Sequence, residues 1–307
     1  MITASIGLAL LAIALAGPVP VALAAAPWTA RAPAAALLVW QSIALAGGLS
    51  MLGALFIAGL VPFGDTLTTS VSSLLGHAAS GTLPTGFGLA HLLALAAGIL
   101  LGAHLVLTLI TAIARTKREQ DRHRSLVALL SEPLDDRSDT RVIEQDAPIA
   151  YCLPVGFGSV TVLSAGLIRL LDAEQLRAVI AHEKGHLVQR HYVVLTAFAA
   201  WRSALPWFPT ASRAHRAVGM LVEMLADDYA RRSVGARAIA GAIERVAGFA
   251  PGALPGEALG TGDATVAPRI ERLVGDSRPL RPVAHATVIA AAVLLIAIPT
   301  ALLLVPR

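Results

Sequence analysis

Charged residues are scarce in this 307-residue chain. Only 14% of the residues are charged and 56% are hydrophobic, whereas globular proteins carry about 25% charged and about 45–50% apolar residues. This composition argues against an ordinary soluble enzyme and excludes a disordered chain. The single cysteine, Cys152, excludes an intrachain disulfide and hence a disulfide-stabilised scaffold.

The few charges are distributed unevenly. All but two of the 24 Lys and Arg residues and all but one of the 20 acidic residues lie within 115–282. The formal net charge is +4, but no basic stripe with interleaved aromatic residues is present, so no direct nucleic-acid binding is expected. The sequence therefore predicts a polar domain inserted into a hydrophobic one.

Four apolar runs are long enough to cross a bilayer as helices. They cover about residues 2–26, 34–63, 87–114 and 283–305, and about 20 apolar residues suffice for one span. No Lys or Arg precedes the first run, so we interpret it as a retained span, kinked at Pro18 and Pro20, rather than a secretory signal. The predicted domains are thus three spans in 1–114, a polar domain in 115–282 and a fourth span in 283–307.

Positive charges next to the spans predict the orientation. Five Lys and Arg residues lie between Arg115 and Arg124, and Arg278 and Arg281 precede the fourth span. Because cytoplasmic flanks carry the excess of positive charge, the polar domain is expected in the cytoplasm, with the loop 64–86 and both termini outside. Two histidines within the third span, His91 and His104, are interpreted as hydrogen-bonded structural residues rather than site residues.

A zinc-binding pattern lies within the polar domain. Asp172 and Gln175 form a capping box that predicts the start of a helix, and His182-Glu183-Lys184-Gly185-His186 follows on it. Histidines at i and i+4 share one helix face and can hold one Zn²⁺, while Glu183 can act as general base. The alternative is a solvated helix whose His and Glu lie at the surface.

The third ligand is expected from a second helix. The extended three-histidine pattern is excluded because Gln189 and Tyr192 occupy its Gly and His positions. Glu223 and Asp227 lie one turn apart, so Glu223 can bind the metal while Asp227 holds a ligand histidine by its second ring N–H. Asp228 points elsewhere and is interpreted as a solvated or capping residue.

Three other segments have weaker signals. Residues 149–153 and 159–163 are predicted as short strands, which either bind an extended substrate by strand addition or form a purely structural hairpin. Residues 192–207 are apolar enough to approach the bilayer but too short to span it. Residues 251–268, rich in Gly and Pro, are predicted to form a loop.

The pairing of His182-Glu183-Lys184-Gly185-His186 with Glu223-Met-Leu-Ala-Asp227 resembles the BlaR/MecR-type integral membrane zinc metallopeptidases and, more distantly, the HtpX and Ste-type membrane proteases. This resemblance implies an α-helical membrane protein with four transmembrane helices and an inserted, mainly α (α+β), gluzincin-like zinc metallopeptidase domain in the bacterial inner membrane. It implies one Zn²⁺ bound by His182, His186 and Glu223, with Glu183 as general base and Asp227 behind the ligands. Arg269 resembles a recurring element near the active site, and a surface salt bridge is its alternative role.

The function implied by the resemblance is cleavage of a cytoplasmic protein, with a BlaI/MecI-type transcriptional repressor favoured as substrate in a stress or antibiotic response. Membrane-protein quality control of the HtpX/Ste type is the enzymatic alternative. A catalytically idle receptor or scaffold is an alternative of another class, and a transporter is the least favoured. The expected partners are the protein substrate and the lipid bilayer, and a homodimer is left open. Direct β-lactam sensing is not expected, because the sequence stops at Arg307 where sensor members of the family continue into a penicillin-binding domain.

Overall fold

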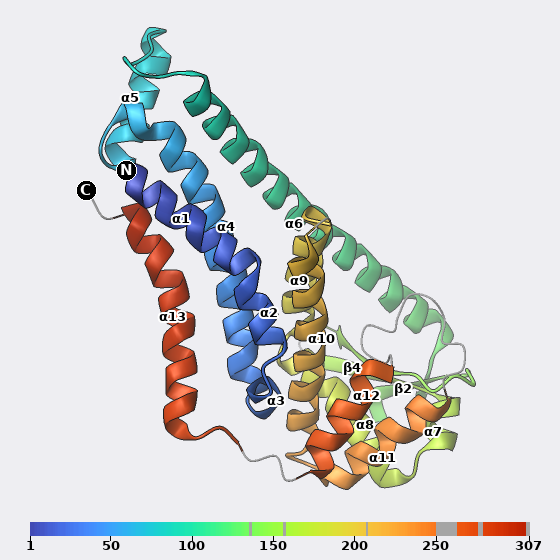
Figure 1. Cartoon of the computed structure of the whole chain (residues 1–307). Coiled ribbons are helices and arrows are strands. Elements are labelled where there is room, and N and C mark those ends of the chain that lie inside the picture. Colours follow the sequence, from blue (N-terminus) through green and yellow to red (C-terminus); the bar gives the residue numbers. More distant parts are fainter. Residues whose placement is uncertain (135–136, 156–157, 207, 250–262, 276–278, 305–307) are drawn as a thin grey trace.

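The structure, a computed structural model, describes residues 1–134, 137–155, 158–206, 208–249, 263–275 and 279–304. It is mostly helical, with one small mixed sheet. A bundle of long helices carries a smaller domain at one end, and the N-terminus and the end of the last helix lie together at the opposite end (Figure 1). Trp207, Arg278 and residues 250–262 and 305–307 lie outside the described residues.

Four helical segments are long and apolar enough to cross a membrane, in agreement with the four predicted spans. They are Ile2–Ala24, Pro33–Phe63, Leu89–Val127 and Pro282–Leu304. The first comprises α1 (Ile2–Ala16) and α2 (Pro18–Ala24), and the second comprises α4 (Pro33–Leu60) and the 3₁₀ turn η1 (Val61–Phe63), while short α3 (Trp28–Arg31) connects them. The third lies in α6 (Leu89–Leu130), which continues 16 residues beyond the predicted end at residue 114, and the fourth is α13 (Pro282–Leu304).

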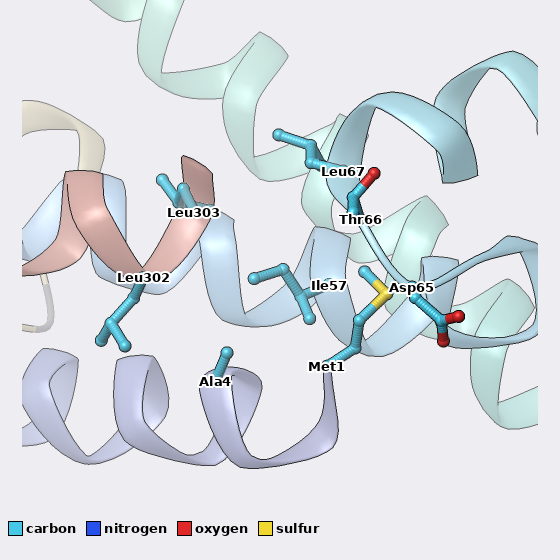
Figure 2. Close-up of a pocket in the computed structure, with 8 residues that line it drawn as sticks. All are labelled: Met1, Ala4, Ile57, Asp65, Thr66, Leu67, Leu302 and Leu303. Atoms are coloured by element: carbon cyan, nitrogen blue, oxygen red, sulfur yellow. The ribbon is translucent and has the colours of Figure 1, made fainter. Parts of the chain in front are cut away.

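The segment between the second and third spans is a helix rather than the predicted loop. Helix α5 (Leu67–Ser80) begins at Thr66, whose hydroxyl accepts a hydrogen bond from the Thr69 N–H. The prediction missed this helix because its residues are small and polar, whereas an N-cap hydroxyl and a left-handed Gly81 at the C-terminus stabilise it. A cavity of about 20 Å³ lies where α1, α4 and α13 meet this segment (Figure 2), which is room for about one water molecule.

The polar domain contains a four-stranded sheet in the order β1-β2-β4-β3. Its strands are β1 (Glu132–Leu134), β2 (Arg137–Ile143), β3 (Ala150–Val155) and β4 (Gly158–Ser164). The predicted strands are confirmed as the antiparallel pair β3–β4, and β2 pairs with β4 in parallel. Strand β3 therefore forms one edge of the sheet.

In the described part of the chain, six helices lie between the sheet and α13: α7 (Ala165–Leu170), α8 (Ala173–Val188), α9 (His191–Ala204), α10 (Pro209–Ala230), α11 (Ala236–Phe249) and α12 (Asp263–Val274). Helix α12 begins inside the segment predicted as a loop and contains Pro268, so the loop prediction is wrong from residue 263 onward. A proline inside a helix removes one backbone hydrogen bond. Burial of Arg269 and Leu273 on the same helix offsets that loss.

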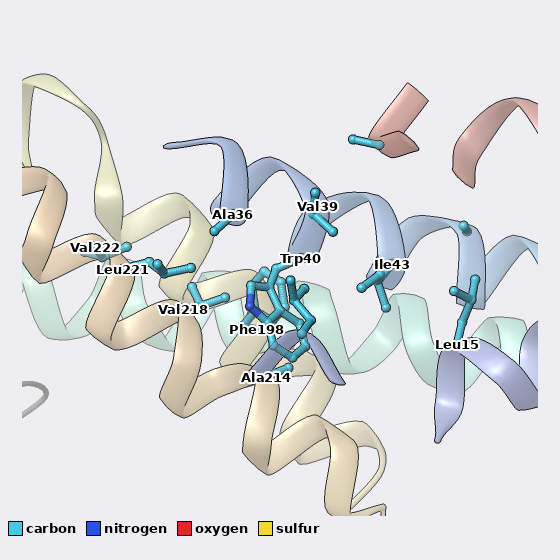
Figure 3. Packing of buried hydrophobic residues seen from close by; sticks show 13 residues of the cluster. Leu15, Ala36, Val39, Trp40, Ile43, Phe198, Ala214, Val218, Leu221 and Val222 are labelled. Carbon is cyan, nitrogen blue, oxygen red and sulfur yellow. The ribbon is translucent and has the colours of Figure 1, made fainter. Parts of the chain in front are cut away.

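Helices α9 and α10 form a hairpin that packs among the long helices. Phe198 of α9 and Ala214 and Val218 of α10 share one buried cluster with Trp40 and Ile43 of α4 (Figure 3). The hairpin also contacts α2 and α6. The core of the polar domain is thus continuous with the core of the helical bundle.

The tip of this hairpin is held by two polar contacts. His104 Nε2 of α6 lies 3.0 Å from the Ala204 carbonyl oxygen at the end of α9, as expected for a structural histidine. The Thr210 hydroxyl donates a hydrogen bond to the Ala16 carbonyl oxygen. That carbonyl lacks its helical partner because Pro20, four residues later, has no N–H, so the kink between α1 and α2 is where α10 attaches.

Candidate metal centre

The two predicted ligand histidines lie on α8, whose start is fixed by its cap. The Asp172 carboxylate accepts hydrogen bonds from the N–H groups of Glu174 and Gln175, and the Asp172 N–H donates to the Gln175 side chain. This confirms the capping box predicted from the sequence. His182 and His186 follow one turn apart, with ring centroids separated by 4.8 Å.

A glycine inside the motif lets α10 approach α8 closely. Gly185 is buried, and a Cβ at this position would lie 3.0 Å from the Cβ of Tyr229 on α10. Nine in ten of the contacts that Cβ atoms make in real proteins are longer than this distance. Gly185 therefore allows the close packing that brings Glu223 over the two histidines.

Three side chains converge on one point. The Nε2 atoms of His182 and His186 lie 3.1 Å apart, and the Glu223 carboxylate oxygens lie 3.4 and 3.5 Å from them. One ligand atom from each residue lies within 4.8 Å of the others. Two imidazole nitrogens and one carboxylate oxygen are a donor set typical of catalytic zinc, which leaves a fourth position for water or substrate.

Behind the ligands, Asp227 and Arg269 form a buried network. Asp227 Oδ1 lies 2.9 Å from His182 Nδ1, on the side of the ring away from Glu223. The Arg269 guanidinium donates to both Asp227 oxygens at 2.7 and 2.9 Å and lies 2.9 Å from Glu223 Oε2. Because the Arg269 side chain is only 6% exposed, its alternative role as a surface salt bridge is wrong.

Asp228 points away from the metal centre, as expected, but it is not simply solvated. Its carboxylate accepts two hydrogen bonds from Arg272, at 2.8 and 2.7 Å. Arg272 Nε also donates to the Ala30 carbonyl oxygen at 2.6 Å. Residues of α10 and α12 are thereby tied to α3, at the domain end of the first two spans.

A third histidine, His191, lies at the centre and was not predicted from the sequence. His191 Nδ1 lies 3.1 Å from His186 Nδ1, and the His191 side chain is 2% exposed. The chain turns back after α8 at Arg190, which has a left-handed φ of 52°, and this turn brings His191 against the ligand. The sequence does show a histidine five residues after His186, which could have suggested a role near the centre. The left-handed turn that brings it there is not evident from the sequence.

Charge neighbours shift several pKa values within the centre. Burial alone would raise the pKa of Asp227, but hydrogen bonds from Arg269 and His182 lower it to about 2. Burial alone would lower the pKa of His182, but Asp227 and Glu223 raise it to about 9. Burial and the neighbouring His182 lower the pKa of His186 to about 3. Since histidine binds metal only through a neutral ring, cation binding at His182 must displace a proton.

Glu183 differs from the other carboxylates of the centre. Burial raises its pKa to about 7, with Glu223 contributing and His182 opposing. In the described part of the chain it forms no ion pair and no side-chain hydrogen bond. A partly buried carboxylate that titrates near neutrality is suited to accept and release a proton.

The arrangement fits a zinc ion. Each ligand histidine has its second ring nitrogen against another side chain, His182 against Asp227 and His186 against His191, and such contacts orient metal-ligating imidazoles in zinc proteins. The three donor groups are two imidazoles and one carboxylate. The structure thus brings together His182, His186 and Glu223, as predicted. Their roles as metal ligands are inferred from the chemistry of their donor atoms.

Comparison with known proteins identifies part of the chain. Residues 113–226 match the model of Peptidase family M48, a family of membrane-associated zinc metallopeptidases. The chain therefore contains an M48 peptidase domain, with His182, Glu183, His186 and Glu223 inside the matched region. The match gives no specific support to the BlaR/MecR type. No curated protein and no solved structure matches the chain.

Proposed function

We propose that this chain is a membrane-embedded zinc endopeptidase. The observation that carries the proposal is the position of Glu183, a partly buried carboxylate without an ion pair, next to the His182, His186 and Glu223 donor set. An idle receptor or scaffold would have no need for a general base at this position. The M48 match and the four apolar helices support the peptidase and membrane parts of the proposal.

The residues of the centre have distinct roles in the proposed reaction. His182, His186 and Glu223 would hold Zn²⁺, which when bound would supply Lewis-acid chemistry that polarises a peptide carbonyl and makes water more acidic. Glu183 removes a proton from the attacking water and returns it to the leaving amine nitrogen. Asp227 and Arg269 keep His182 and Glu223 oriented through the contacts described above.

The edge strand β3 is the proposed place for the substrate backbone. It packs against α8, and among the described residues it pairs only with β4. An extended peptide can add to such an edge through main-chain hydrogen bonds. This mode would bind substrates with little dependence on their sequence.

A soluble transcriptional repressor of the BlaI/MecI type is the proposed natural substrate, on the basis of the resemblance of the motifs. It requires the polar domain to face the cytoplasm, as the flanking positive charges predict. Labelling of single cysteines in intact cells, with Cys152 replaced by serine, tests this orientation. A cysteine at exposed Ala79 of α5 should react with an impermeant reagent, while one at exposed Ala173 of α8 should be protected. The reverse pattern would exclude a cytoplasmic substrate.

Membrane-protein quality control is the second candidate, and one observation favours it. An open cavity of about 450 Å³ lies between α4, α10 and α13, lined by Gln41, Gln189, Leu225 and Ile289 among others. It faces two of the apolar helices, so a substrate segment leaving the bilayer would meet it. Cleavage of a membrane protein but not of a winged-helix repressor by the reconstituted enzyme would favour this candidate.

Substitution of the general base tests the peptidase proposal itself. Glu183→Gln should retain one zinc per chain and lose roughly 10²- to 10⁴-fold in cleavage rate, the usual contribution of general acid–base catalysis. Glu174→Gln, an exposed position in the first turn of the same helix, is the matched control and should cleave normally. Cleavage by Glu183→Gln at the wild-type rate would contradict the mechanism.

A further inference from the structure

The tip of the α9–α10 hairpin carries positive charge without internal compensation. Arg202 near the end of α9 and Arg213 and Arg216 near the start of α10 form no ion pair within the part of the chain that the structure describes. The sequence explains why, since no Asp or Glu occurs between Glu183 and Glu223. Arg202 and Arg216 are exposed and Arg213 is partly exposed, so their guanidinium groups are accessible to a ligand.

A histidine next to these arginines in sequence also lacks a hydrogen-bond partner among the described residues. His215 lies between Arg213 and Arg216 in sequence, and its Nδ1 atom is buried without a hydrogen bond among the described residues. Burial and the nearby charges of Arg202 and Arg216 lower the pKa of His215. Arg202, two residues before the end of α9, and Arg213 and Arg216, near the start of α10, thus lie on neighbouring helices of the same hairpin tip.

The contacts of the hairpin tip fix its depth relative to the apolar helices. Ala16, which accepts the Thr210 hydrogen bond, is 14 residues from the start of the first span, and His104, which contacts Ala204, is 15 residues from the start of the third. At about 1.5 Å per residue, both contacts lie about 21–23 Å from the outer ends of these helices. A hydrocarbon core about 30 Å thick would then extend about 8 Å beyond the tip, toward the polar domain.

Arg213 and Arg216 therefore lie near the domain-side edge of the hydrocarbon core, whereas Arg202, about 3 Å from the tip, lies about 5 Å inside that edge. Arg213 and Arg216 follow the start of α10 at Pro209 by four and seven residues, which places them about 6 and 10 Å from the tip on the domain side. Long arginine side chains can extend toward the interface from the edge of the hydrocarbon core. Basic pockets between membrane helices on the cytoplasmic side, where the flanking charges predict the polar domain to lie, are typical binding sites for phospholipid headgroups.

We propose that Arg202, Arg213 and Arg216 bind the phosphate of an anionic phospholipid at the tip of the α9–α10 hairpin. The proposal goes beyond the peptidase activity and rests only on the membrane location. A bound lipid would supply the anion that the chain lacks here. It would also anchor α10, the helix that carries Glu223, to the membrane surface.

Native mass spectrometry of the full-length protein in detergent tests the proposal, with phosphatidylglycerol and phosphatidylcholine of identical acyl chains as probes. The wild type should bind phosphatidylglycerol preferentially. The triple variant Arg202→Gln/Arg213→Gln/Arg216→Gln should lose one to two orders of magnitude in affinity, since each basic residue near an anionic surface contributes about fivefold. The control Arg177→Gln/Arg231→Gln/Arg237→Gln removes the same charge at exposed positions elsewhere and should bind as the wild type does.

Each alternative outcome overturns the proposal. Equal affinity for the two lipids would show no site for an anionic headgroup, and equal loss in the control would show only a general effect of charge. Displacement of the lipid by millimolar inorganic phosphate would indicate a site for free phosphate. If the triple variant fails to fold, Arg216→Gln alone should still lose about fivefold. Zinc content and peptide cleavage report separately on the peptidase, so failure of the lipid site can be distinguished from failure of the proposed function.

Discussion

The metal centre and the apolar helices bury polar groups in opposite ways. In the centre, His182, His186, Glu223, Asp227 and Arg269 each lie within 3.5 Å of another ionisable side chain. Where the α9–α10 hairpin meets the apolar helices, two polar groups each make a single contact. The His104 ring and the Thr210 hydroxyl each lie against one carbonyl oxygen at a helix end or kink.

This difference indicates how each region should respond to substitution. In a buried ion network, removal of one partner leaves an uncompensated charge, so the effect is large and extends to the neighbours. A single neutral hydrogen bond between helices affects only the two groups that it joins, and its loss costs about 1 kcal/mol.

Arg269→Met should be the most damaging of these substitutions. It removes the guanidinium that contacts both Asp227 and Glu223, and breaking a buried ion pair costs about 3–5 kcal/mol. The variant should unfold at lower temperature in detergent and lose zinc. Arg245→Met, at an exposed position on α11 whose guanidinium contacts the Leu170 carbonyl, is the control. Equal stability of the two variants would contradict the network.

Glu183→Gln should stabilise the protein when zinc is removed by a chelator. The pKa of Glu183 is about 7 in the folded protein against 4.5 for the ordinary group, so the folded state opposes its ionisation. The destabilisation is absent below pH 4.5, grows as the pH rises and is complete above pH 7. Allowing for partial exposure, it amounts to about 2 kcal/mol.

Thermal unfolding at pH 5 and pH 8 measures this effect. The variant should exceed the wild type mainly at pH 8, while exposed Glu174→Gln should show no such dependence. A lower unfolding temperature for Glu183→Gln at pH 8 would mean that Glu183 contributes to stability rather than opposing it. Its role as a strained, functional carboxylate would then be wrong.

Local patterns in the sequence predicted the spans and the ligand set because both depend on short-range spacing. Apolar runs of about 20 residues indicate helices that can span a membrane, and His182 and His186 share a helix face by virtue of their spacing. The cap at Asp172 was predictable for the same reason. The side of the membrane on which the domain lies stays a prediction.

Features that depend on tertiary contacts were not predictable. Helix α12 contains Pro268 against its local preference, because Arg269 must reach Asp227 from another part of the chain. His191 depends on the left-handed turn at Arg190. The insertion of the α9–α10 hairpin depends on packing against Trp40 of α4. The sequence of neither segment predicts that the two are in contact.

His191→Phe should weaken zinc binding with a smaller effect on stability. The His191 ring lies 3.1 Å from the far nitrogen of the ligand His186, and loss of such contacts typically costs 10- to 100-fold in metal affinity. Competition with a chromophoric chelator measures this change. His191→Asn, which keeps a hydrogen-bonding group, should recover part of the affinity, whereas Tyr192→Phe at the exposed neighbouring position should leave it unchanged. Wild-type affinity in His191→Phe would show that the contact is merely packing.

Thr210→Val should have the smallest effect, because it removes one neutral hydrogen bond and conserves shape. Thr210 is 4% exposed, and its hydroxyl is the partner of the Ala16 carbonyl that Pro20 leaves without a helical donor. This bond joins α10 to the kink of the first span, and we expect its loss to lower stability by about 1 kcal/mol, as measured by unfolding in detergent. Thr300→Val is the matched control, since the Thr300 hydroxyl contacts the Ile296 carbonyl four residues earlier in the same helix and that carbonyl keeps its backbone donor.

Equal losses in the two variants would show that the hairpin is held by apolar packing alone. A loss as large as that of Arg269→Met would remove the distinction between the two regions.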